Sequence, residues 1–113
     1  MASVPELTPH ALADWFRSGR EVTLLDVREV DERDFCKIAG GAAGDLHVPV
    51  SEVAVNLETI RAACRPLVVY CHHGVRSRMV ADWLAAQGLT DVWNLRGGIE
   101  AWSVKVDPGV ARY

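Results

Sequence analysis

The stretch that decides the fold lies in the second half of the chain and reads Leu67-Val68-Val69-Tyr70-Cys71-His72-His73-Gly74-Val75-Arg76-Ser77. Its first four residues are apolar, partly β-branched and preceded by Pro66, which is typical of a short buried parallel strand. Four apolar residues then recur at helical spacing: Met79, Val80, Trp83 and Leu84. Gly88 is suited to end that helix. The sequence therefore predicts a strand, a tight loop opened by Cys71, and a helix.

A turn of this kind collects backbone N–H groups that have no intrahelical acceptor, at the positive end of a helix dipole. An anion is expected there, and Cys71 supplies it, because a helix N-terminus and the nearby Arg76 favour a thiolate over a thiol. The alternative is a buried structural cysteine, which is the common fate of a free cysteine. We favour a functional cysteine, since loops at the ends of parallel strands carry function.

Apolar and turn-forming segments alternate along all 113 residues, without a linker or repeat, which predicts one α/β domain over residues 1–113. We expect strands at 22–27, 46–48, 67–70 and 91–95. We expect a loop at 40–44 because of its glycines. Helical segments are expected at 8–19 with Thr8-Pro9 as its start, at 29–35, from Ser51 to about Cys64, at 75–88, and after Gly97-Gly98.

Charge and cysteine content narrow the class of protein. A formal charge of −3 and the lack of a Lys/Arg cluster argue against nucleic-acid binding. No apolar run approaches a membrane span, and the first residues lack a signal-peptide pattern. Three irregularly spaced cysteines fit a reducing compartment. Cys36 and Cys64 are expected to pack in the core, and the alternative for either is a resolving thiol. We therefore expect a cytoplasmic protein with no nucleic-acid or membrane partner.

The loop resembles the active-site loop of the rhodanese family of single-domain sulfurtransferases, in which a cysteine opens a short loop that closes with an arginine and a small hydroxyl residue. Two further segments resemble signatures of that family: Leu25-Asp26-Val27-Arg28-Glu29 and Asn94-Leu95-Arg96-Gly97-Gly98-Ile99-Glu100-Ala101-Trp102. Ile38-Ala39-Gly40 and Val48-Pro49 resemble, less closely, the segment that leads to the third strand. The resemblance implies a rhodanese-like α/β fold, a small parallel sheet with helices on both faces, and an extra strand at Ser3-Val4.

The segment around residues 37–44 departs from the family pattern, whereas the C-terminal segment extends the resemblance. Lys37 stands where the family usually has a histidine, and the extra small residues 41–44 leave the register of the third strand open. Residues 106–113 resemble the tail of rhodanese domains fused to ubiquitin-like-activating enzymes of molybdopterin and thiamine sulfur delivery. That likeness favours a protein or carrier thiol as acceptor, although the tail can equally pack on the edge of the sheet.

A cysteine nucleophile in an amide cradle serves either sulfur transfer through a persulfide or attack on a phosphoryl group. Four residues separate Cys71 from Arg76, one fewer than in the Cys-x5-Arg loop of cysteine phosphatases, and the narrower ring suits a terminal sulfur. We therefore predict a thiosulfate sulfurtransferase-type enzyme that moves sulfane sulfur from a donor such as thiosulfate to cyanide, a small thiol or a protein thiol. It needs no metal or organic cofactor. The alternatives are a non-catalytic rhodanese-like interaction module and a cysteine phosphatase or arsenate reductase.

Each residue of the loop has an expected role. Amides of residues 72–76 hold the persulfide, in the loop formed by His72, His73, Gly74, Val75, Arg76 and Ser77. Arg76 has two expected roles that are compatible with each other: it favours the thiolate and holds an anionic donor, which we prefer, and it pairs with a carboxylate and closes the loop. Ser77 is expected to cap the helix, with a hydrogen bond to the sulfur as a further option.

The remaining polar residues are expected to support the site. His72 and His73 are expected to point apart because they are adjacent in a tight loop, and no metal site is expected because the chain lacks the spaced Cys/His pairs of the zinc pattern. Since sulfur transfer between thiolates needs little proton shuttling, the two histidines are expected to shape the mouth of the loop and to set partner preference. Asp26 and Arg28 lie at the carboxyl end of the first confident strand, where a charged pair can brace the site or satisfy local backbone donors. The resemblance implies the bracing role.

Overall fold

The computed structural model describes residues 3–39 and 43–113. All strand pairings are parallel, and the sheet has the order β1-β5-β4-β2-β3. The strands are β1 (Glu6–Leu7), β2 (Thr23–Asp26), β3 (Gly44–His47), β4 (Leu67–Tyr70) and β5 (Val92–Leu95). The α-helices are α1 (Pro9–Arg17), α2 (Val30–Phe35), α3 (Leu57–Arg61), α4 (Val75–Ala86) and α5 (Gly98–Lys105). The predicted small parallel sheet with helices is confirmed.

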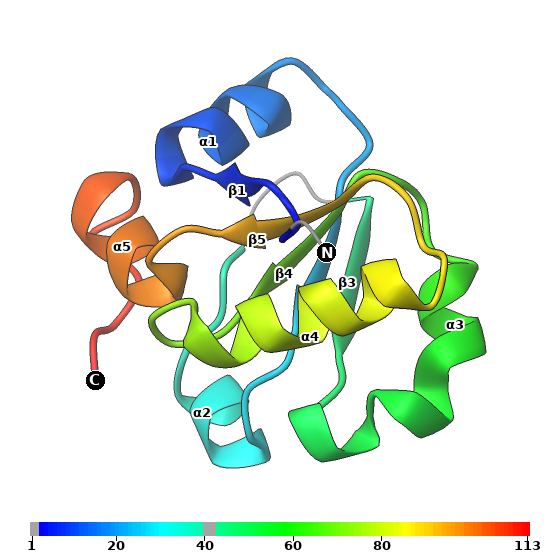
Figure 1. Ribbon diagram of the computed structural model, residues 1–113. Helices are drawn as coiled ribbons and strands as arrows, with labels where there is room; N and C mark the ends of the chain where they lie inside the picture. Colours follow the sequence, from blue (N-terminus) through cyan, green and yellow to red (C-terminus); the bar gives the residue numbers. More distant parts are fainter. Residues whose placement is uncertain (1–2, 40–42) are drawn as a thin grey trace.

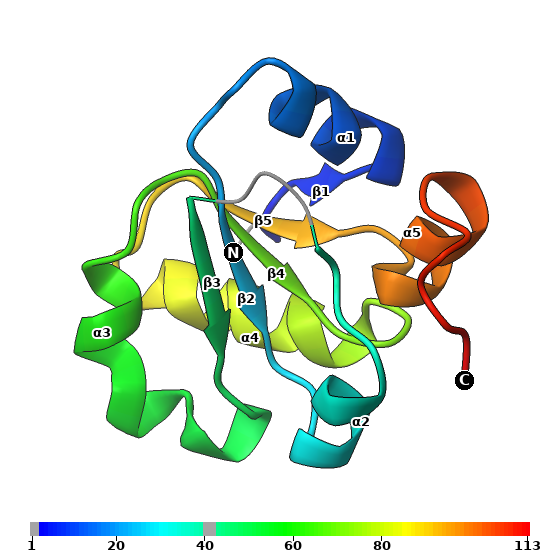
Figure 2. The same ribbon diagram turned by 180° about the vertical axis from the view of Figure 1, so that it is seen from behind.

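Helices cover both faces of the sheet, because successive residues of a strand point to opposite sides (Figures 1 and 2). Leu25 and Val69 pack with α3 and α4 on one face, in the cluster that also contains Cys71. Leu24 and Val68 pack with α1 and α5 on the other. β4 lies in the middle of the sheet, so its carboxyl end delivers Cys71 to the centre of one edge.

Local signals fix the helix ends. The Thr8 hydroxyl accepts a hydrogen bond from the Ala11 amide at 3.2 Å, so the predicted start of α1 at Thr8-Pro9 is confirmed. Gly19 and Gly88 follow α1 and α4 with positive φ angles, as predicted. No helix in the described ranges is long and apolar enough to cross a membrane.

The helix predicted from Ser51 to about Cys64 is wrong in extent. The chain forms two 3₁₀ turns, η1 (Val50–Glu52) and η2 (Ala54–Asn56), before the short α3. The side-chain Nδ2 of Asn56 donates to the Glu52 carbonyl at 2.8 Å, and such local side-chain bonds compete with a regular helix. Because α3 stops at Arg61, Cys64 leaves the apolar face and is exposed, contrary to its predicted burial. Cys36 is partly buried and packs against the core, as predicted.

The segment around β3 also differs from the prediction. Residues 40–42 of the predicted loop lie outside the described residues, but Gly44 begins β3 and does not belong to a loop. A Cβ at Gly44 would lie 2.9 Å from Thr23 Oγ1, so this glycine permits the two strands to approach. The first strand is Glu6–Leu7 and not Ser3-Val4, although Val4 is buried in the core.

Candidate active site

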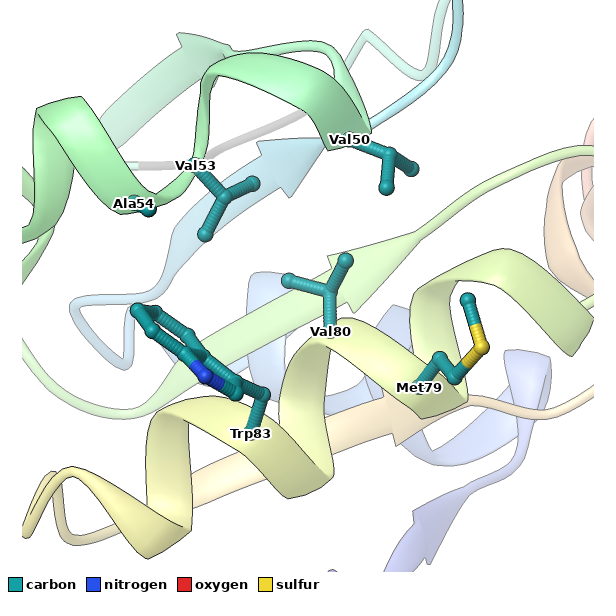
Figure 3. A pocket seen from close by; sticks show the side chains of 6 residues that line it. All are labelled: Val50, Val53, Ala54, Met79, Val80 and Trp83. Atoms are coloured by element: carbon teal, nitrogen blue, oxygen red, sulfur yellow. The ribbon is translucent and has the colours of Figure 1, made fainter.

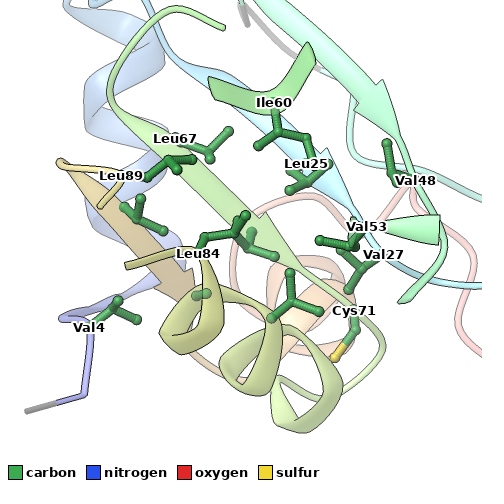
Figure 4. Packing of buried hydrophobic residues seen from close by; sticks show 14 residues of the cluster. Val4, Leu25, Val27, Val48, Val53, Ile60, Leu67, Cys71, Leu84 and Leu89 are labelled. Atoms are coloured by element: carbon green, nitrogen blue, oxygen red, sulfur yellow. The ribbon is translucent and has the colours of Figure 1, made fainter. Parts of the chain in front are cut away.

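Cys71 lies directly after β4, and its sulfur accepts hydrogen bonds from the loop that follows. The Gly74 amide lies 3.1 Å from Cys71 Sγ, and the Ser77 amide lies 3.4 Å from it. Figure 4 shows Cys71 at the end of the buried cluster, beside Val27 and Val53. The side of the loop that faces the sheet is therefore apolar, and the sulfur lies among backbone donors.

The N-terminus of α5 holds the first two carbonyls of the loop. The Ile99 amide donates to the Cys71 carbonyl at 2.9 Å, and the Glu100 amide donates to the His72 carbonyl at 3.1 Å. Gly98 has a φ of +63°, and a Cβ there would lie 2.5 Å from Cys71 O and 2.4 Å from His72 O. Gly98 is a site residue that the loop sequence alone does not identify; its signal lies in the segment 94–102, which resembles a family signature.

Ser77 and Asn94 fasten the other side of the loop. The buried Ser77 hydroxyl donates to Asn94 Oδ1 at 2.6 Å, while Asn94 Nδ2 donates to the Gly74 carbonyl at 3.1 Å. Ser77 therefore bonds the sulfur through its backbone amide. Its hydroxyl bonds to Asn94 and does not cap α4, contrary to the prediction. Asn94 comes from β5, and nothing in the loop sequence points to it.

Arg76 pairs with Glu32 of α2. Arg76 Nη1 and Nη2 lie 2.7 and 2.9 Å from Glu32 Oε1 and Oε2, in a two-bond arrangement. These bonds lower the pKa of Glu32 to about 2 and raise the pKa of Arg76. The carboxylate pair expected to close the loop is therefore present, and the preferred role of Arg76 toward the thiolate and an anionic donor stays a prediction.

Asp26, the last residue of β2, and Arg28 form a fully buried ion pair. Arg28 Nε and Nη2 donate to the two oxygens of Asp26 at 2.9 and 2.8 Å, and Nη2 also donates to the Cys36 carbonyl at 2.6 Å. Burial disfavours the charge of Arg28, but its bonds to Asp26 and Tyr113 outweigh burial and raise its pKa. The pair joins β2 to the segment after α2.

The last residue of the tail, Tyr113, packs on the loop, while Val110 is buried in the core cluster that contains Leu7 of the edge strand β1. The Tyr113 ring stacks on His72 at 3.8 Å between centroids, and its hydroxyl donates to Glu32 Oε2 at 2.7 Å. His72 in turn stacks on His73 at 3.9 Å, so the prediction that the two histidines point apart is wrong. Burial, and next the charge of His73, lowers the pKa of His72. Tyr113 is a further site residue whose role required the three-dimensional contact.

Two hollows flank the first turns of α4. An apolar groove of about 310 Å³ separates the 3₁₀ turns from α4 (Figure 3), and it is lined by Val50, Val53, Ala54, Met79, Val80 and Trp83. A hollow of about 530 Å³ reaches the loop at His73 and Gly74 and includes Arg78 and Arg96 with Glu6 and Asp82. Charged groups thus lie in the second hollow and around the loop, and not in the groove.

The chain is similar in sequence and in fold to known proteins. The rhodanese-like domain profile matches residues 8–105. The chain is 34% identical over 83 residues to "Thiosulfate sulfurtransferase GlpE" of Coxiella burnetii, an alignment that covers 74% of this chain and 73% of the relative. A crystal structure of a rhodanese-related protein from Thermoplasma volcanium has a TM-score of 0.77 and 27% identity, and the match covers 96% of this chain and 99% of that one.

Longer relatives contain the same domain as a part. "Probable adenylyltransferase/sulfurtransferase MoeZ" of Mycobacterium tuberculosis is 35% identical over 112 residues, which cover 95% of this chain and 26% of the relative. The chain thus spans about a quarter of the length of that protein. The family profile and the fold agree over nearly all of the described residues, and the chain belongs to the rhodanese-like domain family.

Proposed function

We propose that the protein is a sulfurtransferase that carries sulfane sulfur on Cys71. The observation that carries this proposal is the position of Cys71 Sγ, which accepts bonds from the Gly74 and Ser77 amides at the mouth of a narrow loop. Val75 and Arg76 open α4, so their amides lack intrahelical acceptors. A terminal persulfide sulfur can bond to these donors. The named sulfurtransferase relatives support the same chemistry.

The proposed reaction has two balanced steps. The Cys71 thiolate attacks the outer sulfur of thiosulfate, the S–S bond of the donor breaks, and sulfite leaves with the bonding electron pair. Cyanide or an acceptor thiolate then attacks the terminal sulfur of the persulfide. The Cys–S–S bond breaks, Cys71 regains its thiolate, and thiocyanate or a new persulfide leaves. Both steps transfer sulfur between anions, so neither histidine has to move a proton.

The surroundings of Cys71 suit a stored persulfide. The thiol is 1% exposed, and apolar neighbours from the core lie behind it. An acceptor must therefore approach along the mouth of the loop, beside His72 and His73. The donor is proposed to be a small anion such as thiosulfate, and the acceptor a small thiol or a protein thiol. Three free cysteines, including the exposed Cys64, fit work in a reducing compartment such as the cytoplasm.

The test is the intact mass of the protein after incubation with thiosulfate and removal of excess donor. We expect the wild type to gain one sulfur atom, to lose it to cyanide, and Cys71→Ser to gain none. Cys64→Ser is the matched control, because Cys64 is exposed and lies away from the loop, and it should gain sulfur like the wild type. A wild type that gains no sulfur, or an equal gain on Cys71→Ser, would defeat the proposal.

A further inference from the structure

Arg76 is the cation nearest in sequence to the predicted persulfide ring, yet both of its terminal nitrogens bond to Glu32. The pair is partly shielded from water, since the Glu32 side chain is 16% exposed and that of Arg76 is 36% exposed. Because the two charges lie within 3 Å of one another, the pair contributes almost no net charge at the loop.

Glu32 is held in this position by groups other than Arg76. The Tyr113 hydroxyl donates to Glu32 Oε2 at 2.7 Å, and the Glu29 amide donates to Glu32 Oε1 at 3.0 Å. With a pKa of about 2, the carboxylate stays ionised throughout the physiological range. Glu32 is thus a fixed negative charge, and Tyr113 positions it.

The other cations on this side of the loop are also matched by acids. Arg28 pairs with Asp26, and Arg33 pairs with Asp26 and Asp45. Burial keeps the pKa of His72 below its usual value, which favours its neutral form. Among the described residues, a doubly charged donor that approaches past α2 therefore meets backbone dipoles and paired arginines, whereas Arg78 and Arg96 lie in the separate hollow beside His73 and Gly74.

We propose that Glu32 determines the charge selectivity of sulfur transfer: by neutralising Arg76 it makes the loop discriminate against dianionic donors relative to monoanionic donors of the same sulfane sulfur. The inference rests on the proposed function. Removal of the Glu32 charge leaves Arg76 free to attract the second charge of a dianion. The affinity for a monoanion should gain less, because one charge is already stabilised by the amide ring.

The test compares two donors, thiosulfate with two negative charges and methanethiosulfonate with one. Both give Cys71 one sulfur atom and release a sulfur oxyanion, sulfite or methanesulfinate, so their chemistry is matched. The readout is the ratio of their KM values. For Glu32→Gln we expect the KM for thiosulfate to fall roughly tenfold relative to the KM for methanethiosulfonate. This is the effect of one additional, partly screened contact between Arg76 and the second charge of thiosulfate.

Asp31→Asn is the matched control, because Asp31 is an exposed acid of the same helix and its substitution changes the net charge equally. Its KM ratio should match the wild type. Tyr113→Phe keeps the ring on His72 and removes the bond to Glu32, so it should shift the ratio in the same direction by less. If Glu32→Gln fails to fold, the ratio of the two KM values in Tyr113→Phe tests the inference in its place.

The outcomes separate the two proposals. A wild type that forms no Cys71 persulfide defeats the proposed function, and the inference falls with it. Persulfide formation with an unchanged ratio in Glu32→Gln, or in Tyr113→Phe where that variant decides, overturns the inference alone. An equal shift in Asp31→Asn also overturns it, because overall charge and not the pair would then set the ratio.

Discussion

Glu32 shows how much one side chain can connect at this site. It accepts hydrogen bonds from the loop through Arg76, from the tail through Tyr113, and from the start of its own helix through the Glu29 amide. Glu32 and Glu29 together form a capping box, which also fixes the first turn of α2. Its ionised form should therefore stabilise the fold as well as the loop.

The stability of the fold should depend on the charge of Glu32 in acid. Its folded pKa of about 2 lies below the ordinary value of 4.5, so its contribution is present above pH 4.5 and is lost as pH falls towards 2. The difference in free energy of unfolding between wild type and Glu32→Gln should shrink over that window by on the order of 2 kcal/mol. Denaturant unfolding at a series of pH values measures it, and a difference that is constant with pH would contradict the pairing.

At the scale of the element, the active loop is built from three segments of the chain. Cys71 directly follows β4, and backbone amides at the N-terminus of α5 donate to the carbonyls of Cys71 and His72. The side-chain Nδ2 of Asn94, from β5, donates to the Gly74 carbonyl. The shape of the loop therefore depends on how closely α5 approaches it, and Gly98 sets that approach.

Replacement of Gly98 tests this dependence. Gly98→Ala would place a Cβ against two carbonyl oxygens at a positive φ, whereas Gly88→Ala has a φ of +92° with no atom within 4 Å. We expect Gly88→Ala to lower the free energy of unfolding by about 1 kcal/mol and Gly98→Ala to lower it by at least about 3 kcal/mol. Only Gly98→Ala should lose persulfide formation. Denaturant midpoints and intact mass measure both effects, and equal behaviour of the two variants would argue against the packing of α5 on the loop.

Sequence patterns correctly predict those strands and helices whose ends and packing depend on residues close together in the chain. The strand and helix around Cys71 and the cap at Thr8 follow from hydrophobic spacing and end residues, and both are confirmed. The break at Asn56 escapes prediction, because a side chain there competes with the backbone. The bonds of Ser77 to Asn94 and of Tyr113 to Glu32 join distant parts of the sequence, and no spacing rule encodes such contacts.

At the scale of the whole molecule, Arg28 links the sheet, α2 and the tail through one buried guanidinium. It donates to Asp26 at the end of β2, to the carbonyls of Glu32 and Cys36, and to the Tyr113 hydroxyl at 3.0 Å. A buried arginine needs this many acceptors, because an unpaired charge in the interior is costly. The buried Arg28 side chain therefore holds both α2 and the tail in their positions next to the loop.

Replacement of Arg28 should accordingly destabilise the whole fold. Arg28→Met removes the guanidinium but leaves the Asp26 carboxylate, which is 0% exposed, with Arg33 Nη1 at 3.3 Å as its nearest remaining ion-pair partner. We expect a loss of about 3 to 5 kcal/mol in the free energy of unfolding. Arg61→Met is the matched control, since Arg61 forms an exposed pair with Glu58, and it should cost less than about 1 kcal/mol. Urea unfolding followed by tryptophan fluorescence gives both values. Similar losses in the two variants would show that the buried pair does not stabilise the fold beyond a surface one.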